Sequence, residues 1–306
     1  MLALVTVPES AGGLRLTELE EPRPAANEAL IATHATSLNR GELRLLALRP
    51  NGWIPGQDVA GIVERAATDG SGPAVGARVA ALADEAGWAE RVAVPTDRMA
   101  VLADGVDFVC AATLPVAGIT ALRTLRLGGD LIGQRVLVTA GSGAVGRLQI
   151  QIARQHGASV TAVAAARHAA DLRGLGAAQV VESIEEAQGP FSLIAESVGG
   201  ESLARAIERV APGGTIVMFG SSSGELTSVG FRQFVPGREG ARLQTFAYYA
   251  SGPGIDADLA SLLGLLAAGR LEARVALTLP WHDVGRALEA LRRRDISGKA
   301  VLTIAS

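Results

Sequence analysis

The chain has 306 residues, which is enough for two domains of ordinary size or one large domain. Its 48% hydrophobic and 19% charged residues are typical of a globular protein, and its net charge of −3 argues against a nucleic-acid-binding surface. A single cysteine, Cys110, excludes an intramolecular disulfide framework and any zinc or iron–sulfur site built from several cysteines.

The N-terminal part of the chain predicts short strands separated by turns. Alternating or continuous apolar runs favour strands, and glycine and proline residues interrupt them. We expect strands at residues 14–19, 29–33, 56–63, 78–83 and 89–94, and a loop at residues 43–52. The pattern predicts a small, mostly antiparallel barrel or sandwich.

From residue 111 onward, strands alternate with helices. Helices are expected at residues 111–127, 144–156, 168–173, 202–210, 257–268 and 283–294. Strands are expected at 135–139, 159–165, 179–181, 192–195, 214–219 and 300–304, and a loop at 223–242. This alternation predicts an α/β fold with a doubly wound parallel sheet.

The expected location follows from two absences. The N-terminal residues lack a basic region followed by an apolar one, so we expect no secretory signal. The most apolar helical stretch, residues 259–268, is about half as long as the roughly 20 residues that a membrane span needs. We therefore expect a cytoplasmic protein with neither a membrane nor a nucleic acid as partner.

Residues 136–146 carry the chemical motif of the chain. They read Val-Leu-Val-Thr-Ala-Gly-Ser-Gly-Ala-Val-Gly, a G-x-G-x-x-G motif between a predicted strand and a predicted helix. Here Gly141 permits the tight turn, Gly143 lets the backbone approach a pyrophosphate, and Gly146 lets the helix pack on the strand. We predict that a dinucleotide binds at Gly141, Ser142, Gly143, Ala144, Val145 and Gly146. The alternative is a glycine-rich turn without a ligand.

The end of the second predicted strand indicates which dinucleotide binds. A site that prefers NAD places a carboxylate there to accept a hydrogen bond from the ribose 2′-hydroxyl, but this chain has none before Asp171. Arg167 can instead bind a 2′-phosphate, and His168 can add to that contact. NADPH is therefore favoured over NADH. The alternative for Arg167 is an ordinary solvated arginine.

The remaining cofactor contacts are expected at the carboxyl ends of the later strands, because ligands of parallel sheets bind there. The residues at these ends are Ser197, Val198, Phe219, Gly220 and Ser221.

Six further segments have a recognisable pattern. They are Ser-Leu-Asn-Arg-Gly-Glu at 37–42, Pro-Gly-Gln-Asp-Val-Ala-Gly at 55–61, Val-Gly-Ala-Arg-Val at 75–79, Gly-Trp-Ala-Glu at 87–90, Leu-Pro-Val-Ala-Gly-Ile-Thr-Ala at 114–121 and Ser-Gly-Lys-Ala-Val-Leu at 297–302. Together with the glycine motif, they resemble the zinc-independent branch of the medium-chain dehydrogenase/reductase superfamily, to which quinone oxidoreductases and enoyl reductases belong. The likeness extends over essentially the whole chain.

The resemblance implies two domains. A β-rich, GroES-like catalytic domain is expected at residues 1–115 and 270–306, and a Rossmann dinucleotide-binding domain at 116–269. It also implies a substrate site in the cleft between them, and a homodimer. Zinc-dependent relatives have a cysteine near Ser37 and Gly-His-Glu where this chain has Gly56-Gln57-Asp58, so no metal is expected.

The same resemblance suggests roles for individual residues. Asn39 and Thr120 are candidates for donating a hydrogen bond to the substrate oxygen; the alternative is that they only hold the loop and the cofactor in place. Trp53 and Tyr248 are candidates for the substrate pocket. Lys299, the one lysine of the chain, is a candidate cofactor-binding residue at the edge of the cleft.

The expected function is an NADPH-dependent oxidoreductase that transfers hydride to a quinone or to an activated C=C bond of enone, 2-alkenal or enoyl type. The substrate would be a small hydrophobic electron acceptor. Two alternatives remain open. One is an NADPH-binding regulatory or non-catalytic protein on the same fold, and the other is a tailoring reductase of a biosynthetic pathway with a polyketide-like substrate.

Overall fold

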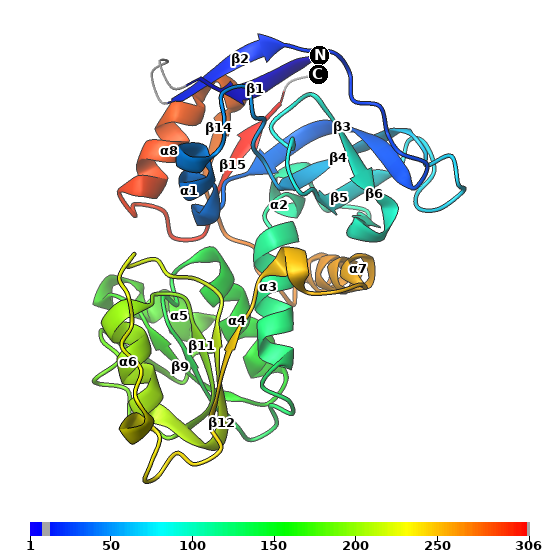
Figure 1. Ribbon diagram of the computed structural model, residues 1–306. Coiled ribbons are helices and arrows are strands. Elements are labelled where there is room, and N and C mark those ends of the chain that lie inside the picture. The colour runs from blue at the N-terminus through cyan, green and yellow to red at the C-terminus, as the bar shows by residue number, and fades with distance from the viewer. Residues whose placement is uncertain (8–12, 305–306) are drawn as a thin grey trace. The chain divides into compact units, whose positions relative to one another are not determined.

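The computed structural model describes residues 1–7 and 13–304 of the chain. The chain forms two compact units: unit 1 comprises Met1–Ile119 and Gly252–Ser306, and unit 2 comprises Thr120–Ser251. Figure 1 labels most of the helices and strands of both units.

Unit 1 is built on a mostly antiparallel seven-stranded sheet. Its strands run in the order β14-β15-β3-β4-β5-β7, and β6 pairs with β3; only the β14–β15 pair is parallel among the described strands of this sheet. A separate antiparallel pair joins β1 to β2. The strands are β1 (Leu2–Thr6), β2 (Leu14–Glu18), β3 (Glu28–Ser37), β4 (Asp58–Arg65), β5 (Arg78–Leu82), β6 (Arg91–Pro95), β7 (Met99–Val101), β14 (Val275–Pro280) and β15 (Lys299–Thr303).

Helices cover the core of unit 1. They are α1 (Arg40–Leu48), α2 (Phe108–Ala111), α7 (Ile255–Ala267) and α8 (Val284–Arg292), with 3₁₀ turns η2 (Thr96–Arg98) and η6 (Trp281–Asp283). Helix α8 is amphipathic, and its Leu288 joins Leu302 of β15 and Trp88 in one buried cluster. Burial of these apolar side chains is what holds the helix on the sheet.

Unit 2 contains a six-stranded, fully parallel sheet in the order β10-β9-β8-β11-β12-β13. The strands are β8 (Arg135–Val138), β9 (Ser159–Val163), β10 (Gln179–Val181), β11 (Phe191–Glu196), β12 (Val210–Met218) and β13 (Arg242–Thr245). The helices are α4 (Ala144–Gln155), α5 (Ala169–Gly174) and α6 (Gly200–Arg209), with turns η3 (Ala166–His168), η4 (Phe231–Gln233) and η5 (Tyr248–Ala250). Helix α3 (Pro115–Arg126) contains the boundary between the units.

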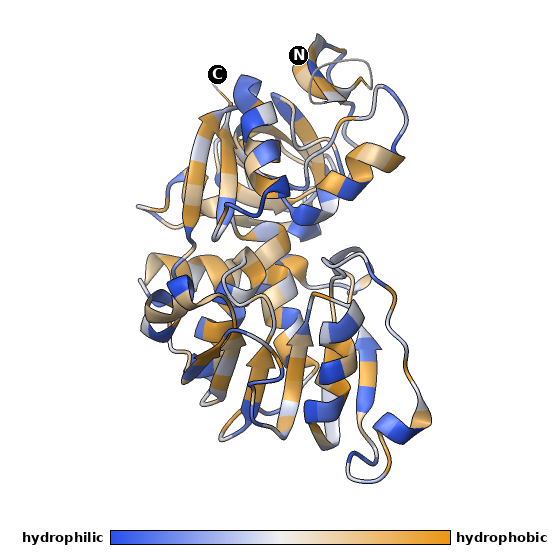
Figure 2. Cartoon of the chain, turned by 90° about the vertical axis from the view of Figure 1, so that its left-hand side faces the viewer, coloured by the Kyte–Doolittle hydropathy of each residue, from blue (hydrophilic) through white to orange (hydrophobic). Residues whose placement is uncertain are grey.

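This sheet confirms the predicted doubly wound fold. The chain passes outward from β8 through β9 to β10 and then returns to β11 on the other side of β8. Strand order therefore reverses between β8 and β11, and such a reversal is where parallel sheets bind ligands. Val136, Leu137 and Val138 of β8 are all buried because both faces of a central strand are covered. Figure 2 shows the strands of this sheet mainly in the hydrophobic colours.

Three expectations differ from the structure. Residues 43–52 were expected to be a loop, but α1 extends through Leu48, and Glu42 Oε2 stabilises the start of this helix by accepting a hydrogen bond from the Asn39 N–H at 2.7 Å. The helix expected at 111–127 is divided, with α3 beginning at Pro115, a favourable first position. Residues 252–269 were expected in the nucleotide-binding domain, but they lie in unit 1, where α7 packs against β7 and η2.

Candidate functional site

The glycine loop of unit 2 connects β8 to α4, as its sequence predicts. A Cβ atom on Gly146 would lie 2.7 Å from the Ala140 carbonyl oxygen and 2.8 Å from the Gly141 Cα, so only glycine lets α4 start this close to the turn. Gly143 is the N-cap of α4 and has no side chain to bond the N–H groups of the first turn. These N–H groups are therefore suited to phosphate oxygens, and the loop fits a dinucleotide.

The other predicted cofactor residues of unit 2 lie at the same edge of the sheet. Arg167 and His168 follow β9, whereas Ser197 and Val198 follow β11 and Phe219, Gly220 and Ser221 follow β12. Because β9, β8, β11 and β12 are parallel neighbours, their carboxyl ends are adjacent. The last two loops also pack together, since the N–H groups of Ser222 and Ser223 donate to the Ser197 and Val198 carbonyls at 3.0 and 2.8 Å. Their contacts with a cofactor stay predictions.

Glu196, the last residue of β11, is a buried carboxylate at the expected strand end, to which the sequence assigned no role. It accepts hydrogen bonds from the Val198 and Gly199 N–H groups at 3.0 Å each, and from the Ser202 hydroxyl at 2.9 Å. Thr139, which follows β8 and precedes the glycine loop, donates its hydroxyl to the same carboxylate at 3.3 Å. Glu196 therefore joins the ends of β8 and β11. The signal for it is an acidic residue at the end of an apolar strand, directly before the turn Ser-Val-Gly-Gly at 197–200.

The turn after β9 presents an exposed cation. The Arg167 side chain is exposed and makes no hydrogen bond or ion pair with any residue in the described part of the chain. Asp171, the nearest carboxylate along the sequence, is paired with the buried guanidinium of Arg147. This arrangement leaves Arg167 able to bind an anion.

Unit 1 contains a buried ionic cluster around Asp58 and Lys299. Their side chains are 0% and 4% exposed, and the ammonium nitrogen lies 2.7 Å from Asp58 Oδ2. The same nitrogen donates to Asn39 Oδ1 at 2.7 Å and to the Leu38 carbonyl at 3.0 Å. These three acceptors match the three hydrogens of the ammonium group. Lys299 therefore makes its polar contacts within unit 1, and its assignment to the cofactor stays a prediction.

Asp58 holds three further donors in this cluster. Its Oδ2 accepts from the Ser37 hydroxyl at 2.5 Å and from Asn39 Nδ2 at 2.8 Å, while its Oδ1 accepts from the Val116 N–H of α3 at 2.7 Å. The Asn39 amide is therefore fixed by Asp58 and Lys299 together, with one N–H hydrogen left over. Its role as a donor to the substrate stays a prediction.

Glu42 lies beside this cluster and is fully buried. Burial raises the pKa of its carboxyl from the ordinary 4.5 to about 8, and the Asp58 carboxylate acts in the same direction. The Asn39 N–H and the Lys299 ammonium oppose the change but do not cancel it. Glu42 is therefore protonated over much of the neutral range.

The other substrate candidates are placed within their own units. The half-buried Trp53 of unit 1 donates its indole N–H to Glu85 Oε2 at 2.7 Å. In unit 2, Arg123 of α3 donates to the Ser251 carbonyl at 2.7 Å and so connects the helix of Thr120 to the turn of Tyr248. The roles of Trp53, Thr120 and Tyr248 stay predictions.

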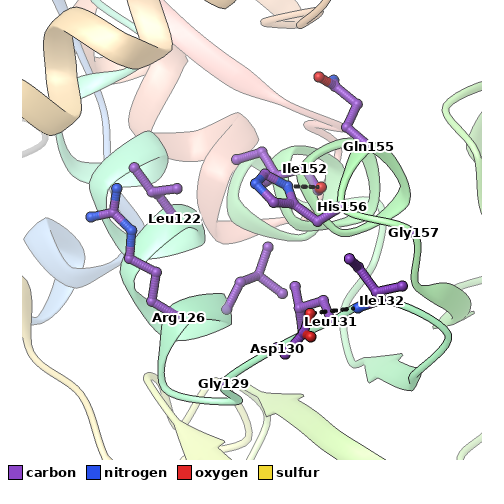
Figure 3. A pocket seen from close by; sticks show the side chains of 11 residues that line it. Leu122, Arg126, Gly129, Asp130, Leu131, Ile132, Ile152, Gln155, His156 and Gly157 are labelled. Atoms are coloured by element: carbon purple, nitrogen blue, oxygen red, sulfur yellow. Dashed lines mark hydrogen bonds between the residues drawn. The ribbon is translucent and has the colours of Figure 1, made fainter.

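A cavity of about 570 Å³ lies elsewhere in unit 2. Figure 3 shows its apolar lining, including Leu122 and Ile152, beside His156, whose Nδ1 donates to the Ile152 carbonyl at 2.8 Å. The residues that line it precede β8 and β9, whereas the glycine loop follows β8. The cavity is therefore at the opposite strand ends from the candidate cofactor site.

The described residues contain neither a metal-binding cluster nor a membrane-spanning helix. No group of three or more His, Cys, Asp or Glu side chains is arranged to hold a metal ion. No helix there has the length and apolar character needed to cross a membrane.

Comparison with known families identifies the fold. An alcohol dehydrogenase GroES-like domain matches residues 25–104, and a zinc-binding dehydrogenase domain matches residues 165–302. The solved structure of the quinone oxidoreductase from Coxiella burnetii covers 100% of this chain and 99% of its own, with a TM-score of 0.86 and 26% identity. The chain belongs to the medium-chain dehydrogenase/reductase superfamily. Its place in the quinone oxidoreductase-like branch and its GroES-like and Rossmann parts are as predicted.

Two curated relatives show how far the similarity extends. The chain is 30% identical over 317 residues to the spectinabilin polyketide synthase system protein NorB of Streptomyces orinoci, and this match covers 99% of the chain but 14% of that protein. It is 30% identical over 247 residues to the chloroplastic NADPH-dependent alkenal/one oxidoreductase of Arabidopsis thaliana, covering 72% of the chain and 62% of that protein. The chain therefore spans less than two thirds of either relative.

Proposed function

We propose that this medium-chain dehydrogenase/reductase is an NADPH-dependent reductase of a quinone or of an activated C=C bond. The observation that carries the proposal is the glycine loop at the edge of the sheet where the exposed guanidinium of Arg167 has no ion-pair partner among the described residues. A relative named as an NADPH-dependent alkenal/one oxidoreductase supports the same class. The nicotinamide, when bound, supplies the hydride, and the protein supplies binding and orientation.

Each part of the candidate site has a proposed task. The N–H groups of the first turn of α4, which follows Gly143, bind the pyrophosphate. Arg167 pairs with the 2′-phosphate. Glu196 holds the loops after β8 and β11 together, so that the turn at Ser197 and Val198 keeps one conformation beside the nicotinamide half. These tasks require no metal ion.

Stabilisation of the substrate oxygen is the remaining task. Negative charge develops on the carbonyl oxygen of an enone or quinone as hydride is added, and a positioned N–H or O–H donor lowers that barrier. We assign this task to the second N–H hydrogen of Asn39 or to the Thr120 hydroxyl. Asp58 and Lys299 hold the Asn39 amide in one orientation, which lowers the cost of reorganisation. Trp53 and Tyr248 are the proposed apolar contacts of a small hydrophobic acceptor.

The polyketide synthase relative favours one narrower substrate class. Because its match covers almost the whole chain, a pathway-specific tailoring reductase that acts on a polyketide-like enoyl group is a second candidate. Turnover of an α,β-unsaturated thioester in preference to quinones would support this candidate.

The proposal is tested by binding and by turnover. Arg167→Asp is expected to weaken NADPH binding by tenfold or more, about the effect of one lost charge-assisted contact, and to change NADH binding little. Arg173→Asp, an exposed arginine on α5, is the matched control. NADPH consumption is then followed with a panel of quinones, 2-alkenals and unsaturated thioesters. Equal losses for both cofactors would refute the 2′-phosphate contact, and NADPH binding without turnover of any acceptor would instead indicate a non-catalytic protein.

A further inference from the structure

A second charged residue reaches the turn that carries Arg167. Glu182 follows β10, which pairs in parallel with β9, and the Ala164 N–H donates to the Val181 carbonyl at 2.9 Å. The Glu182 carboxylate crosses to the end of β9 and accepts a hydrogen bond from the Ala166 N–H through Oε1, at 2.8 Å. Ala166 directly precedes Arg167, so a carboxylate and a guanidinium belong to the same turn.

The Glu182 carboxylate is exposed to solvent. This carboxylate makes no ion pair with any side chain of residues 1–7 or 13–304. The backbone N–H of Glu182 donates to a second carboxylate, at Glu186 Oε2, over 3.3 Å. Asp171 differs in this respect, because Arg147 neutralises it. Glu182 is thus the carboxylate of this turn that can act on a ligand.

The position of this carboxylate has a consequence for the cofactor. In sites that prefer NAD, a carboxylate from the end of the second strand accepts a hydrogen bond from the ribose 2′-hydroxyl. The chain has alanines at that end, at positions 164–166, but Glu182 brings a carboxylate to the same turn from the neighbouring strand. A 2′-phosphate at this turn is attracted by Arg167 and repelled by Glu182.

We propose that Glu182 is a specificity-determining residue that opposes Arg167. It weakens binding of the 2′-phosphate of NADPH and supports binding of the 2′-hydroxyl of NADH, so the protein uses NADH as well as NADPH. This inference rests on the proposed binding of a dinucleotide at the glycine loop.

The test compares Glu182→Gln with Glu186→Gln. Glutamine keeps an oxygen that accepts from the Ala166 N–H, so the turn is preserved while the charge is removed. Glu186 is the matched control because its carboxylate is exposed and close in sequence but does not bond the Ala166 N–H. Dissociation constants are measured by calorimetry for NADPH, NADH, 2′,5′-ADP and 5′-ADP, at low and at high salt.

Glu182→Gln is expected to raise the ratio of NADPH affinity to NADH affinity about two- to fivefold, the size expected of one exposed charge. The ratio for 2′,5′-ADP against 5′-ADP should rise equally, and both effects should shrink at high salt. Glu186→Gln should leave both ratios unchanged. If Glu182→Gln binds the cofactors but its ratio of NADPH to NADH affinity is unchanged or lower, the role of Glu182 alone is overturned. If the wild-type protein binds none of the four ligands, the proposed cofactor is overturned as well.

Discussion

Replacement of Lys299 by methionine tests how far unit 1 depends on its buried ion pair. Lys299→Met keeps most of the apolar stem but removes the ammonium that bonds Asp58, Asn39 and the Leu38 carbonyl. Asp58 would then be a fully buried carboxylate without a cation. Breaking a buried pair from one side costs about 3–5 kcal/mol, because the remaining charge is left uncompensated. We expect a loss of about this size in the free energy of unfolding.

The chain offers a convenient assay for this loss. All three tryptophans, Trp53, Trp88 and Trp281, belong to unit 1, so tryptophan fluorescence during urea denaturation reports the unfolding of that unit. With a urea dependence of about 1–3 kcal/mol per molar, the midpoint should fall by at least about 1 M.

Two further variants make the result interpretable. Arg286→Met removes a surface ion pair in which the Arg286 side chain is 71% exposed and the Asp283 side chain 35%. It should lower the free energy of unfolding by at most about 1 kcal/mol. Adding Asp58→Asn to Lys299→Met removes the uncompensated charge and should recover part of the loss. A Lys299→Met variant no less stable than Arg286→Met would refute the reasoning, since the buried pair would then contribute no more than a surface pair.

Three other predictions concern single residues. Burial raises the pKa of Glu42 to about 8, so the native state holds this proton more tightly than the unfolded chain does. The stability that results is complete below about pH 4.5 and is lost as the pH rises through about 8. The free energy of unfolding should fall by up to about 1.4 kcal/mol per pH unit in this range. Glu42→Gln should abolish this slope in urea titrations, and an unchanged slope would contradict the assignment. Gly146→Ala places a Cβ 2.7 Å from the Ala140 carbonyl oxygen, so it should lower the free energy of unfolding by about 1–3 kcal/mol and weaken NADPH binding. Gly174→Ala, whose Cβ would have no atom within 4 Å, should change neither quantity. Thermal denaturation measures the stability of both variants, and titration with NADPH measures their binding. Glu196→Gln replaces one acceptor oxygen by an NH₂ group, so it should destabilise unit 2 by about 1–3 kcal/mol and weaken dinucleotide binding. Unfolding followed by circular dichroism measures the first effect, and titration with NADPH measures the second. Wild-type values for both would show that the loops do not depend on this carboxylate.

Local patterns account for what could be predicted of this fold. The glycine loop is recognisable because a tight turn, a close helix start and an exposed run of N–H groups each require glycine at a definite spacing along a few residues. The parallel sheet is likewise indicated by the alternation of apolar strands with helices. The start of α1 was missed although its signal is also local, an Asn39 followed three positions later by Glu42.

The sequence by itself determined the family, the parallel sheet and the dinucleotide loop, because these depend on short motifs and on the order in which strands and helices alternate along the chain. Only the tertiary structure showed the Lys299–Asp58 pair, whose members are 241 positions apart, and the contact of Glu182 with the Ala166 turn, which comes from a different strand. The side chains of Lys299, Asp58 and Glu182 belong to no periodic pattern in the sequence that would indicate these contacts. A contact between distant residues arises from strand pairing and shared burial, and these are decided when the sheet assembles.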